Sequence, residues 1–145
     1  MLVGEKTDSN QKPNYSIISK LKLIKMNSQI KQQWVTALRS GEYTQTRWNL
    51  QTEQGFCCLG VLCDLYAKET STEWKVNITE DDEPFTYYNF DEHSNHLPES
   101  VVEWADLEST SPSVKFAEGQ LKELAILNDQ GSTFEEIAQL IEENF

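Results

Sequence analysis

The sequence predicts an α+β protein in which a small antiparallel sheet of three to four strands packs against about five helices and the chain ends in an αα-hairpin. Apolar residues with helical spacing occur near both ends of the chain, whereas alternating and aromatic-rich segments that favour strands occupy its middle. The chain has 145 residues and no internal repeat. This length fits one domain with a sizeable core.

The first residues differ in composition from the rest. Residues 1–26 are rich in Lys, Ser, Asn and Gln, contain Pro13 and lack a steady periodicity. We therefore expect them to be a flexible N-terminal extension. Met26 could serve as an alternative translation start. We expect residues 27–145 to form a single α+β domain.

Two helices are predicted in the first half of the domain. The first runs from about Ser28 to Ser40, with Ser28 as N-cap and Gly41 at the position where a left-handed residue is favoured. The second runs from about Leu59 to Lys68. Their apolar faces follow helical spacing and consist of Ile30, Trp34, Ala37 and Leu38 in the first, and Leu59, Leu62, Cys63 and Tyr66 in the second.

Four segments favour strands. Residues 43–50 and 56–58 contain Thr and aromatic side chains, and the turn at 52–55 between them predicts a β-hairpin. Residues 74–78 alternate in polarity and residues 85–90 are strand-prone, so we expect them to extend the hairpin into an antiparallel sheet. An acidic segment, Glu80-Asp81-Asp82-Glu83-Pro84, connects these last two strands.

The last third of the chain is predicted to be mainly helical. Pro98 suits the first turn of a short helix, and residues 108–116 are expected to be a loop. A further helix is predicted from Leu121 to Asn128, and residues 133–136 form a capping box that starts the final helix. The apolar faces of the first and last of these helices comprise Leu97, Val101, Trp104 and Ala105, and Phe134, Ile137, Ala138, Ile141 and Phe145.

The net charge of −12 is unevenly distributed along the chain. Through Cys63 there are eight Lys or Arg and four Asp or Glu, but from Asp64 onward there are four and twenty. Such an acidic body should be repelled by nucleic acids and anionic membranes and attracted to basic protein surfaces, although the acids could serve solubility alone. No run approaches the roughly 20 apolar residues of a membrane span. We expect a cytoplasmic protein with no cofactor and no direct nucleic-acid binding.

All three cysteines lie in one segment, residues 55–64, which is the least polar window of the chain. Clustering of this kind indicates reduced thiols rather than disulfides that connect distant parts. Cys58 lies at the predicted start of a helix, where the backbone amides and the helix dipole lower a thiol pKa. A cysteine nucleophile also needs a general base, and nothing in the sequence places a histidine beside Cys58.

Zinc binding is a second possible role for this segment. The cysteines together with His93 and His96 supply enough ligands, but their spacing is unlike that of structural zinc sites. We favour a structural role, with the thiols as small apolar core groups and the glycine as a site of close packing. The residues concerned are Cys57, Cys58, Gly60 and Cys63.

Two further groups of residues are candidates for binding. Gln45, Arg47 and Trp48 combine polar and aromatic side chains that could grip a planar or phosphorylated ligand, or they form a surface without a ligand. The second group lies between the last two predicted helices. Asn, Asp and Gly are the residues that a tight helix–helix turn requires, which favours a structural role there. This group comprises Asn128, Asp129 and Gly131.

Three blocks of the chain resemble a family of small uncharacterised proteins encoded by tailed phages and prophages. They are WVTALRSGEYTQ at residues 34–45, GFCCLGVLCD at residues 55–64 and LNDQGSTFEEIAQLIE at residues 127–142. The cysteine-containing block is the most specific of the three. The resemblance spans residues 27–145 and implies an accessory phage protein, without a reaction or catalytic residues that could be carried over.

These observations favour a non-enzymatic, phage-type accessory protein that binds a host or phage macromolecule, most simply a protein. One alternative is a counter-defence protein, either an acidic mimic of nucleic acid or a binder that sequesters a nucleotide around Gln45, Arg47 and Trp48. Another alternative is a thiol enzyme or a zinc module built on the cysteines. These alternatives remain open at the level of the sequence.

Overall fold

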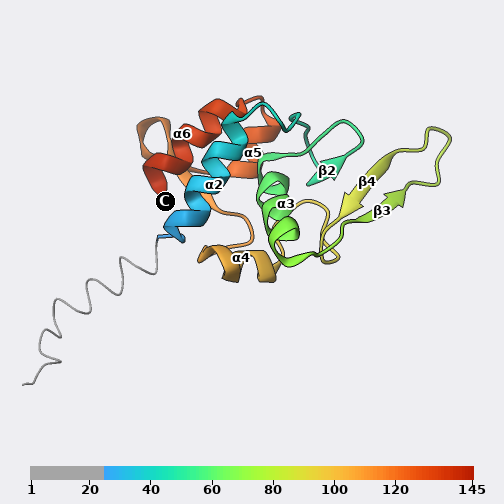
Figure 1. Ribbon diagram of the computed structural model, residues 1–145. Helices are drawn as coiled ribbons and strands as arrows, with labels where there is room; N and C mark the ends of the chain where they lie inside the picture. The colour runs from blue at the N-terminus through green and yellow to red at the C-terminus, as the bar shows by residue number, and fades with distance from the viewer. Residues whose placement is uncertain (1–24) are drawn as a thin grey trace, which may run out of the picture.

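The computed structural model describes residues 25–145, and the predicted N-terminal extension lies outside them except for its last two residues. The described part is an α+β fold with a three-stranded and a two-stranded antiparallel sheet (Figure 1). Its helices are α2 (Ser28–Arg39), α3 (Cys58–Thr70), α4 (Glu99–Ala105), α5 (Leu124–Asp129) and α6 (Phe134–Asn144). Its strands are β2 (Gln51–Thr52), β3 (Lys75–Ile78), β4 (Thr86–Asn89), β5 (Ser113–Phe116) and β6 (Gln120–Glu123).

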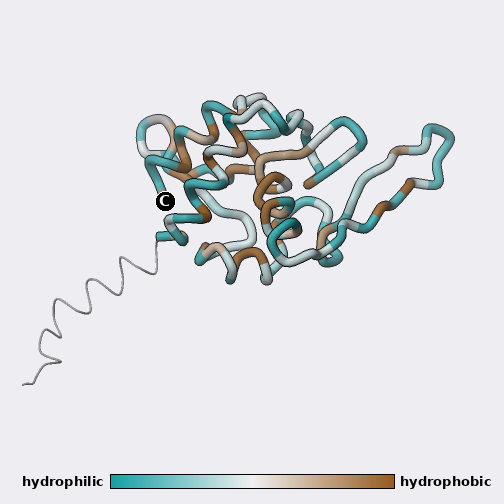
Figure 2. The backbone as a smooth tube through the Cα atoms, in the orientation of Figure 1, coloured by the Kyte–Doolittle hydropathy of each residue, from teal (hydrophilic) through white to brown (hydrophobic). Residues whose placement is uncertain are grey.

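The helices form the body of the molecule, and α3 lies at its centre. Figure 2 shows hydrophobic residues concentrated along α3, whose first six residues are all buried. Helix α2 packs against α6 and α3, while α3 also contacts α4 and α5. Trp34 of α2 is fully buried, and its indole N–H donates a hydrogen bond of 3.0 Å to the carbonyl oxygen of Cys58. The centre of the core is therefore the contact between α2 and the first turn of α3.

Helices α2 and α6 begin at or within one residue of their predicted positions. The predicted capping box of α6 is confirmed, because Thr133 Oγ1 accepts a hydrogen bond from the Glu136 amide and the Glu136 carboxylate accepts one from the Thr133 amide. At α2 the predicted N-cap is wrong by one residue. Asn27, not Ser28, accepts the hydrogen bond from the Ile30 amide, at 2.9 Å.

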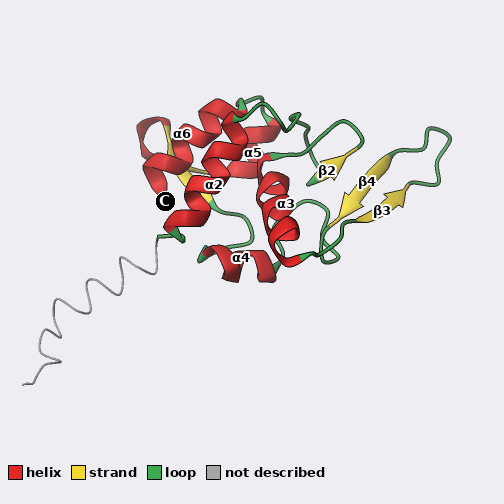
Figure 3. Cartoon of the chain, in the orientation of Figure 1, coloured by secondary structure: helices red, strands yellow, loops and turns green. Residues whose placement is uncertain are grey.

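The three-stranded sheet has the order β2-β4-β3 and lies to one side of the helices, as Figure 3 shows. The predicted pairing of the segments around β3 and β4 is confirmed, with Val76 opposite Tyr88 and Ile78 opposite Thr86. The base of this hairpin joins the helical body through aromatic rings: Phe90 packs edge-on against Tyr66 of α3, with centroids 5.9 Å apart. Beyond that contact the hairpin projects away from the helices (Figure 1).

The predicted hairpin of residues 43–50 and 56–58 is wrong in its first strand. Only an isolated bridge joins Gln45 to Phe56, and the short strand β2 lies further along the chain. Residues 46–50 share only some backbone hydrogen bonds with residues 56–58, such as the one from the Thr46 amide to the Phe56 carbonyl oxygen, and other backbone groups bond elsewhere. The Leu50 amide, for example, donates to the carbonyl oxygen of Ser94 at 2.6 Å. The strand propensity of residues 43–50 does not decide their structure, because backbone groups in this segment form hydrogen bonds with distant residues.

The loop predicted at residues 108–116 and the helix predicted to start at Leu121 are also wrong. Strands β5 and β6 form a second antiparallel pair, and helix α5 begins only at Leu124. A turn with positive φ at Glu118 and Gly119 reverses the chain between the two strands. The side chain of Leu121 is consequently 70% exposed instead of lying on a buried helical face.

Candidate functional site

The cysteine segment is a structural joint between an extended chain and α3. Cys57 is the N-cap of α3, and Cys57, Cys58 and Cys63 are all buried free thiols. Burial raises the pKa of Cys57 to about 11 and raises the pKa values of Cys58 and Cys63 well above the ordinary range. The lowered pKa considered for Cys58 at the helix start is thus wrong, because desolvation outweighs the hydrogen bonds of the backbone amides.

Gly60 provides the close packing expected of it. A Cβ at this position would lie 1.9 Å from the carbonyl oxygen of Leu50. The same oxygen accepts a hydrogen bond of 3.1 Å from the Cys57 amide. The extended chain at Leu50 therefore crosses directly over the first turn of α3, and only glycine leaves room for this crossing.

Asn128 is a buried polar residue whose side chain connects several segments of the chain. It lies at the end of α5, is fully buried and makes four hydrogen bonds. Its Oδ1 accepts from Gln45 Nε2 at 2.8 Å and from the Cys58 amide at 3.1 Å. Its Nδ2 donates to the Thr46 carbonyl oxygen at 2.9 Å and to Asp129 Oδ1 at 3.2 Å. Two acceptor and two donor positions are the full capacity of an asparagine side chain, so the group is satisfied without water.

These bonds give Asn128 a role that its position in a turn did not predict. The Cys58 amide belongs to the first turn of α3, where helix amides lack partners within the helix, and the N-cap residue Cys57 supplies no side-chain bond. Asn128 therefore caps α3 from a distant part of the chain. The structure brings Gln45, Cys58 and Asn128 together, and we refer to this contact as the Asn128 joint.

Asp129 extends the joint to the surface. Its Oδ1 accepts a hydrogen bond of 3.0 Å from the amide of Trp48. Trp48 has a φ of +75°, in the left-handed region that is rare for a non-glycine residue, and its side chain is 67% exposed. The joint thus holds the backbone of residues 45–48 in place while the indole points into solvent. We call residues 45–48 the Trp48 loop.

The rest of the predicted ligand site is only partly assembled. Gln45 is not free to grip a ligand, because its amide nitrogen donates both to Asn128 and to the Ser132 carbonyl oxygen, at 2.9 Å. Arg47 lies near Gly131, and the two residues border a small cavity of about 120 Å³. No ion pair within residues 25–145 involves Arg47. Arg47 and Trp48 therefore form an exposed surface and not an enclosed pocket.

A second polar cluster was not predicted from the sequence. Asp64 closes the cysteine motif, and its Oδ2 accepts a hydrogen bond of 2.7 Å from the Tyr43 hydroxyl and pairs with Lys68 Nζ at 3.2 Å. Its Oδ1 accepts from the indole N–H of Trp74 at 3.1 Å. Burial and the bond to Asp64 raise the pKa of Tyr43. The only sequence signal was the presence of Tyr43 and Asp64 in two of the blocks, since Trp74 lies in a different segment.

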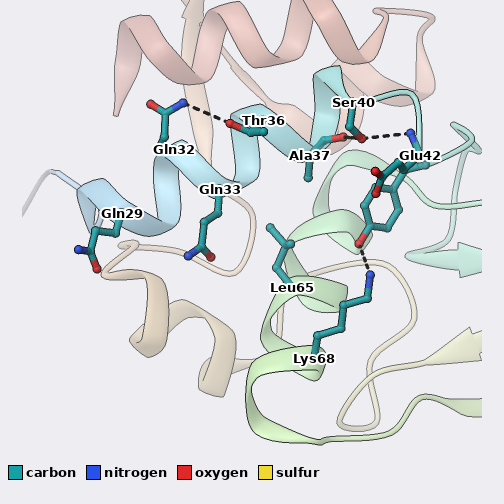
Figure 4. Close-up of a pocket in the computed structure, with 10 residues that line it drawn as sticks. Gln29, Gln32, Gln33, Thr36, Ala37, Ser40, Glu42, Leu65 and Lys68 are labelled. Atoms are coloured by element: carbon teal, nitrogen blue, oxygen red, sulfur yellow. Dashed lines mark hydrogen bonds between the residues drawn. The ribbon is translucent and has the colours of Figure 1, made fainter.

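Lys68 and Tyr43 also border a shallow groove of about 710 Å³ between α2 and α3. Figure 4 shows three glutamines of α2 along one side of this groove and Leu65 and Lys68 of α3 on the other. The groove is lined by Gln29, Gln32, Gln33, Thr36, Ala37, Ser40, Glu42, Tyr43, Leu65 and Lys68. Gln32 is already bonded to Thr36, at 3.2 Å, and Lys68 to the Tyr43 hydroxyl, also at 3.2 Å. The groove offers hydrogen-bonding groups but no arrangement of acid, base and nucleophile.

The two histidines considered as zinc ligands lie beside each other, with ring centroids 4.5 Å apart at His93 and His96. Within residues 25–145 no three His, Cys, Asp or Glu side chains are grouped so that they could hold a metal ion. The same described part of the chain contains no helix of the length and apolar character that crossing a membrane would require.

The family model of the Domain of unknown function (DUF8296) matches residues 26–145 of the chain. The chain belongs to this family. The matched range includes the Asn128 joint, the Trp48 loop and the cysteine segment. Searches of the curated proteins and of the solved structures gave no match. The DUF8296 match therefore defines the family, while the activity must be argued from the site.

Proposed function

We propose that this DUF8296 protein is a non-enzymatic binding module that docks a host or phage protein through the Trp48 loop. The observation that carries the proposal is an exposed tryptophan on a backbone that buried groups hold in place: Trp48 is 67% exposed, and Asp129 binds its amide. Tryptophan and arginine are the residues most enriched at binding hot spots. A loop held in one conformation also loses little entropy on binding.

The contacts of the cysteine segment and of the Asn128 joint support binding over catalysis. The side chains that could carry chemistry in the cysteine segment are buried thiols whose pKa values are raised. A nucleophile would need the thiolate and access to substrate. Asn128 and Gln45 are committed to the joint. Of the predicted ligand-binding residues, Arg47 and Trp48 have exposed side chains.

A protein suits this surface better than a nucleotide. The cavity beside Arg47 holds about 120 Å³, whereas pockets that enclose small ligands measure roughly 300–1,000 Å³. The Asp129 carboxylate, which is bonded to the Trp48 amide, is also unfavourable for a phosphate at this surface. The phage assignment itself is supported by the resemblance of the three sequence blocks.

The test compares Trp48→Ala with Leu121→Ala, a matched control because the side chain of Leu121 is 70% exposed and lies on β6. Immobilised wild-type protein and both variants would be exposed to lysate of bacteria infected with a tailed phage. Any protein retained would then be purified and titrated by calorimetry. We expect Trp48→Ala to weaken binding by about 30-fold, which corresponds to about 2 kcal/mol. Equal binding by Trp48→Ala and wild type would refute the proposal.

The acidic mimic of nucleic acid is a second candidate, favoured by one observation. From Asp64 onward the chain has twenty Asp or Glu and four Lys or Arg. Such a mimic would bind a basic, DNA-handling protein, and salt would weaken this binding through screening. Binding that persists unchanged at high salt would exclude it. A thermal-shift screen with nucleotides tests the remaining ligand class, since a bound nucleotide raises the unfolding temperature.

A further inference from the structure

The hairpin that projects from the helical body ends in an open strand edge. We call residues 74–90 the arm. Strand β3 is the outermost strand in the order β2-β4-β3, and its outer edge pairs with no other strand within residues 25–145. The ribbon in Figure 1 shows this hairpin extending away from the helices, and the side chains of Val76 and Ile78 on β3 are exposed.

The register decides which backbone groups face outward. The Thr79 amide donates to the Phe85 carbonyl oxygen at 3.0 Å, so this pair is hydrogen-bonded. Hydrogen-bonded and non-hydrogen-bonded pairs alternate along an antiparallel ladder. The backbone N–H and C=O groups of Val76 and Ile78 therefore point away from β4, and they present two donors and two acceptors to an incoming strand.

Two of the four side chains of β3 are apolar and exposed, while Lys75 and Asn77 are polar. Val76 is 55% exposed and Ile78 is 61% exposed on one face of the arm. On the other face Phe85 stacks on Tyr87, with ring centroids 6.2 Å apart. Natural edge strands are usually protected by charges, prolines or a covering element. Strand β3 lacks such protection at Val76 and Ile78, as expected of an edge that pairs with another chain.

The arm is also held at its base. Phe90 is fully buried, and Trp74 packs against it while donating its indole N–H to Asp64. The strand edge is thus presented in a defined position before any partner arrives. Preorganisation of this kind reduces the entropy lost on binding.

The acidic charge at the tip of the arm favours a basic segment as the partner of the β3 edge. The tip of the arm contains four consecutive exposed acids, residues 80–83, and no ion pair within residues 25–145 neutralises them. Antiparallel pairing with a second copy about Asn77 would place Asp81 opposite Glu73. It would also join two chains that each carry a net charge of −12. A segment with Lys or Arg beside the tip avoids both repulsions.

We propose that an extended segment of another protein adds to β3 as a new strand, with apolar side chains at alternate positions and basic residues at the end beside the tip. Backbone hydrogen bonds to Val76 and Ile78 supply the part of the affinity that does not depend on the sequence of the added segment. The acids at residues 80–83 supply the preference for a basic segment. This surface uses residues other than the Trp48 loop, so the proposal goes beyond the protein-docking function given above.

Two synthetic peptides test the proposal by fluorescence anisotropy. Both alternate Val and Thr over eight residues; one has three arginines at its N-terminal end, which lies beside the tip in antiparallel addition, and the other has three glutamates there. We expect the arginine peptide to bind the full-length protein at least tenfold more tightly. We also expect hydrogen exchange at the Val76 and Ile78 amides to slow at least tenfold on binding. Equal binding of both peptides, or protection confined to other residues, would overturn the proposal.

Four variants make the test specific. Ile78→Pro removes an outward N–H at an edge position where proline is tolerated, and Asp81→Lys/Asp82→Lys reverses the charge of an exposed loop. Each should weaken arginine-peptide binding at least tenfold. Glu103→Lys/Glu108→Lys makes the same charge change at exposed positions outside the arm and should alter it less than twofold, as should Trp48→Ala.

Sedimentation of the wild-type protein tests the other occupant of the edge. We expect a monomer. A dimer that Ile78→Pro converts to a monomer would show that a second copy fills the edge and would overturn the choice of a basic segment. If Ile78→Pro fails to fold by circular dichroism, the loop variant Asp81→Lys/Asp82→Lys and the exchange data still decide the outcome.

Discussion

The Asn128 joint and the arm use polar backbone groups in opposite ways. At the joint, groups from two distant segments, Gln45–Thr46 and Cys58, converge on the Asn128 side chain, which has no bonding position left over. On the arm, the outward groups of Val76 and Ile78 have no partner within residues 25–145. The joint fixes the fold and the Trp48 loop, whereas the arm presents groups for pairing. We therefore propose that stability and binding depend on different parts of this protein.

The sharpest test of this contrast replaces one asparagine in each region with aspartate. At the joint, Asn128→Asp keeps the shape but loses the donor to Thr46 and places a carboxylate against Asp129. We expect the free energy of unfolding to fall by about 4 kcal/mol, because a buried charge without a partner is costly. On the arm, Asn77→Asp should cost less than about 0.5 kcal/mol. Urea denaturation measures both, and equal effects would break the contrast.

Gly60 tests how tightly the joint is packed. In Gly60→Ala the new methyl group would lie 1.9 Å from the Leu50 carbonyl oxygen. The crossing chain would have to move, which should cost about 3 kcal/mol. Gly41→Ala is the matched control: its φ is +79° but no atom lies within 4 Å of the added Cβ, so only backbone strain of about 1 kcal/mol is expected. Thermal unfolding of both variants would compare them, and a larger loss at Gly41 would contradict the packing argument.

Burial of the thiols makes the free energy of unfolding depend on pH. The folded protein raises the pKa of Cys57 from 9.0 to about 11, so it binds the thiol proton more tightly than the unfolded chain does. Stability from this group is then complete below pH 9 and is lost as the pH rises toward 11, by about 2 to 3 kcal/mol. Urea denaturation between pH 8 and 11 measures the loss. The profile of Cys57→Ala should be flatter, and an identical slope would refute the assignment.

Local sequence signals predicted those parts of the fold that local forces decide. The helical spacing around Trp34 and the capping box at Thr133 each contain their own explanation within a few residues, and both agree with the structure. The segment of residues 43–50 failed because its backbone groups are satisfied by distant partners such as Ser94 and Asp129. The hairpin of β5 and β6 was missed because Leu121 and Leu124 also fit a helical spacing.

In the candidate site, too, the sequence identified individual residues but not the contacts between distant segments. The sequence placed Gln45 and Trp48 in one candidate group and Asn128 in another, with ligand binding as the candidate role of Gln45 and a turn as the favoured role of Asn128. The structure joins the two side chains at 2.8 Å, so that Gln45 supports the loop and Trp48 alone of these three remains exposed. No pattern of residue types could predict this bond, because the two residues lie 83 positions apart in the chain.

By itself the sequence determined the fold class and the acidic character of the second half, and it favoured a structural role for the cysteine segment. These properties follow from residue types and short-range spacing. Only the tertiary structure decided that Asn128 caps α3, that its joint presents Trp48 and that the edge of β3 is open. The physical reason is that hydrogen-bond satisfaction and exposure depend on which distant segments meet, and a linear pattern does not specify those meetings.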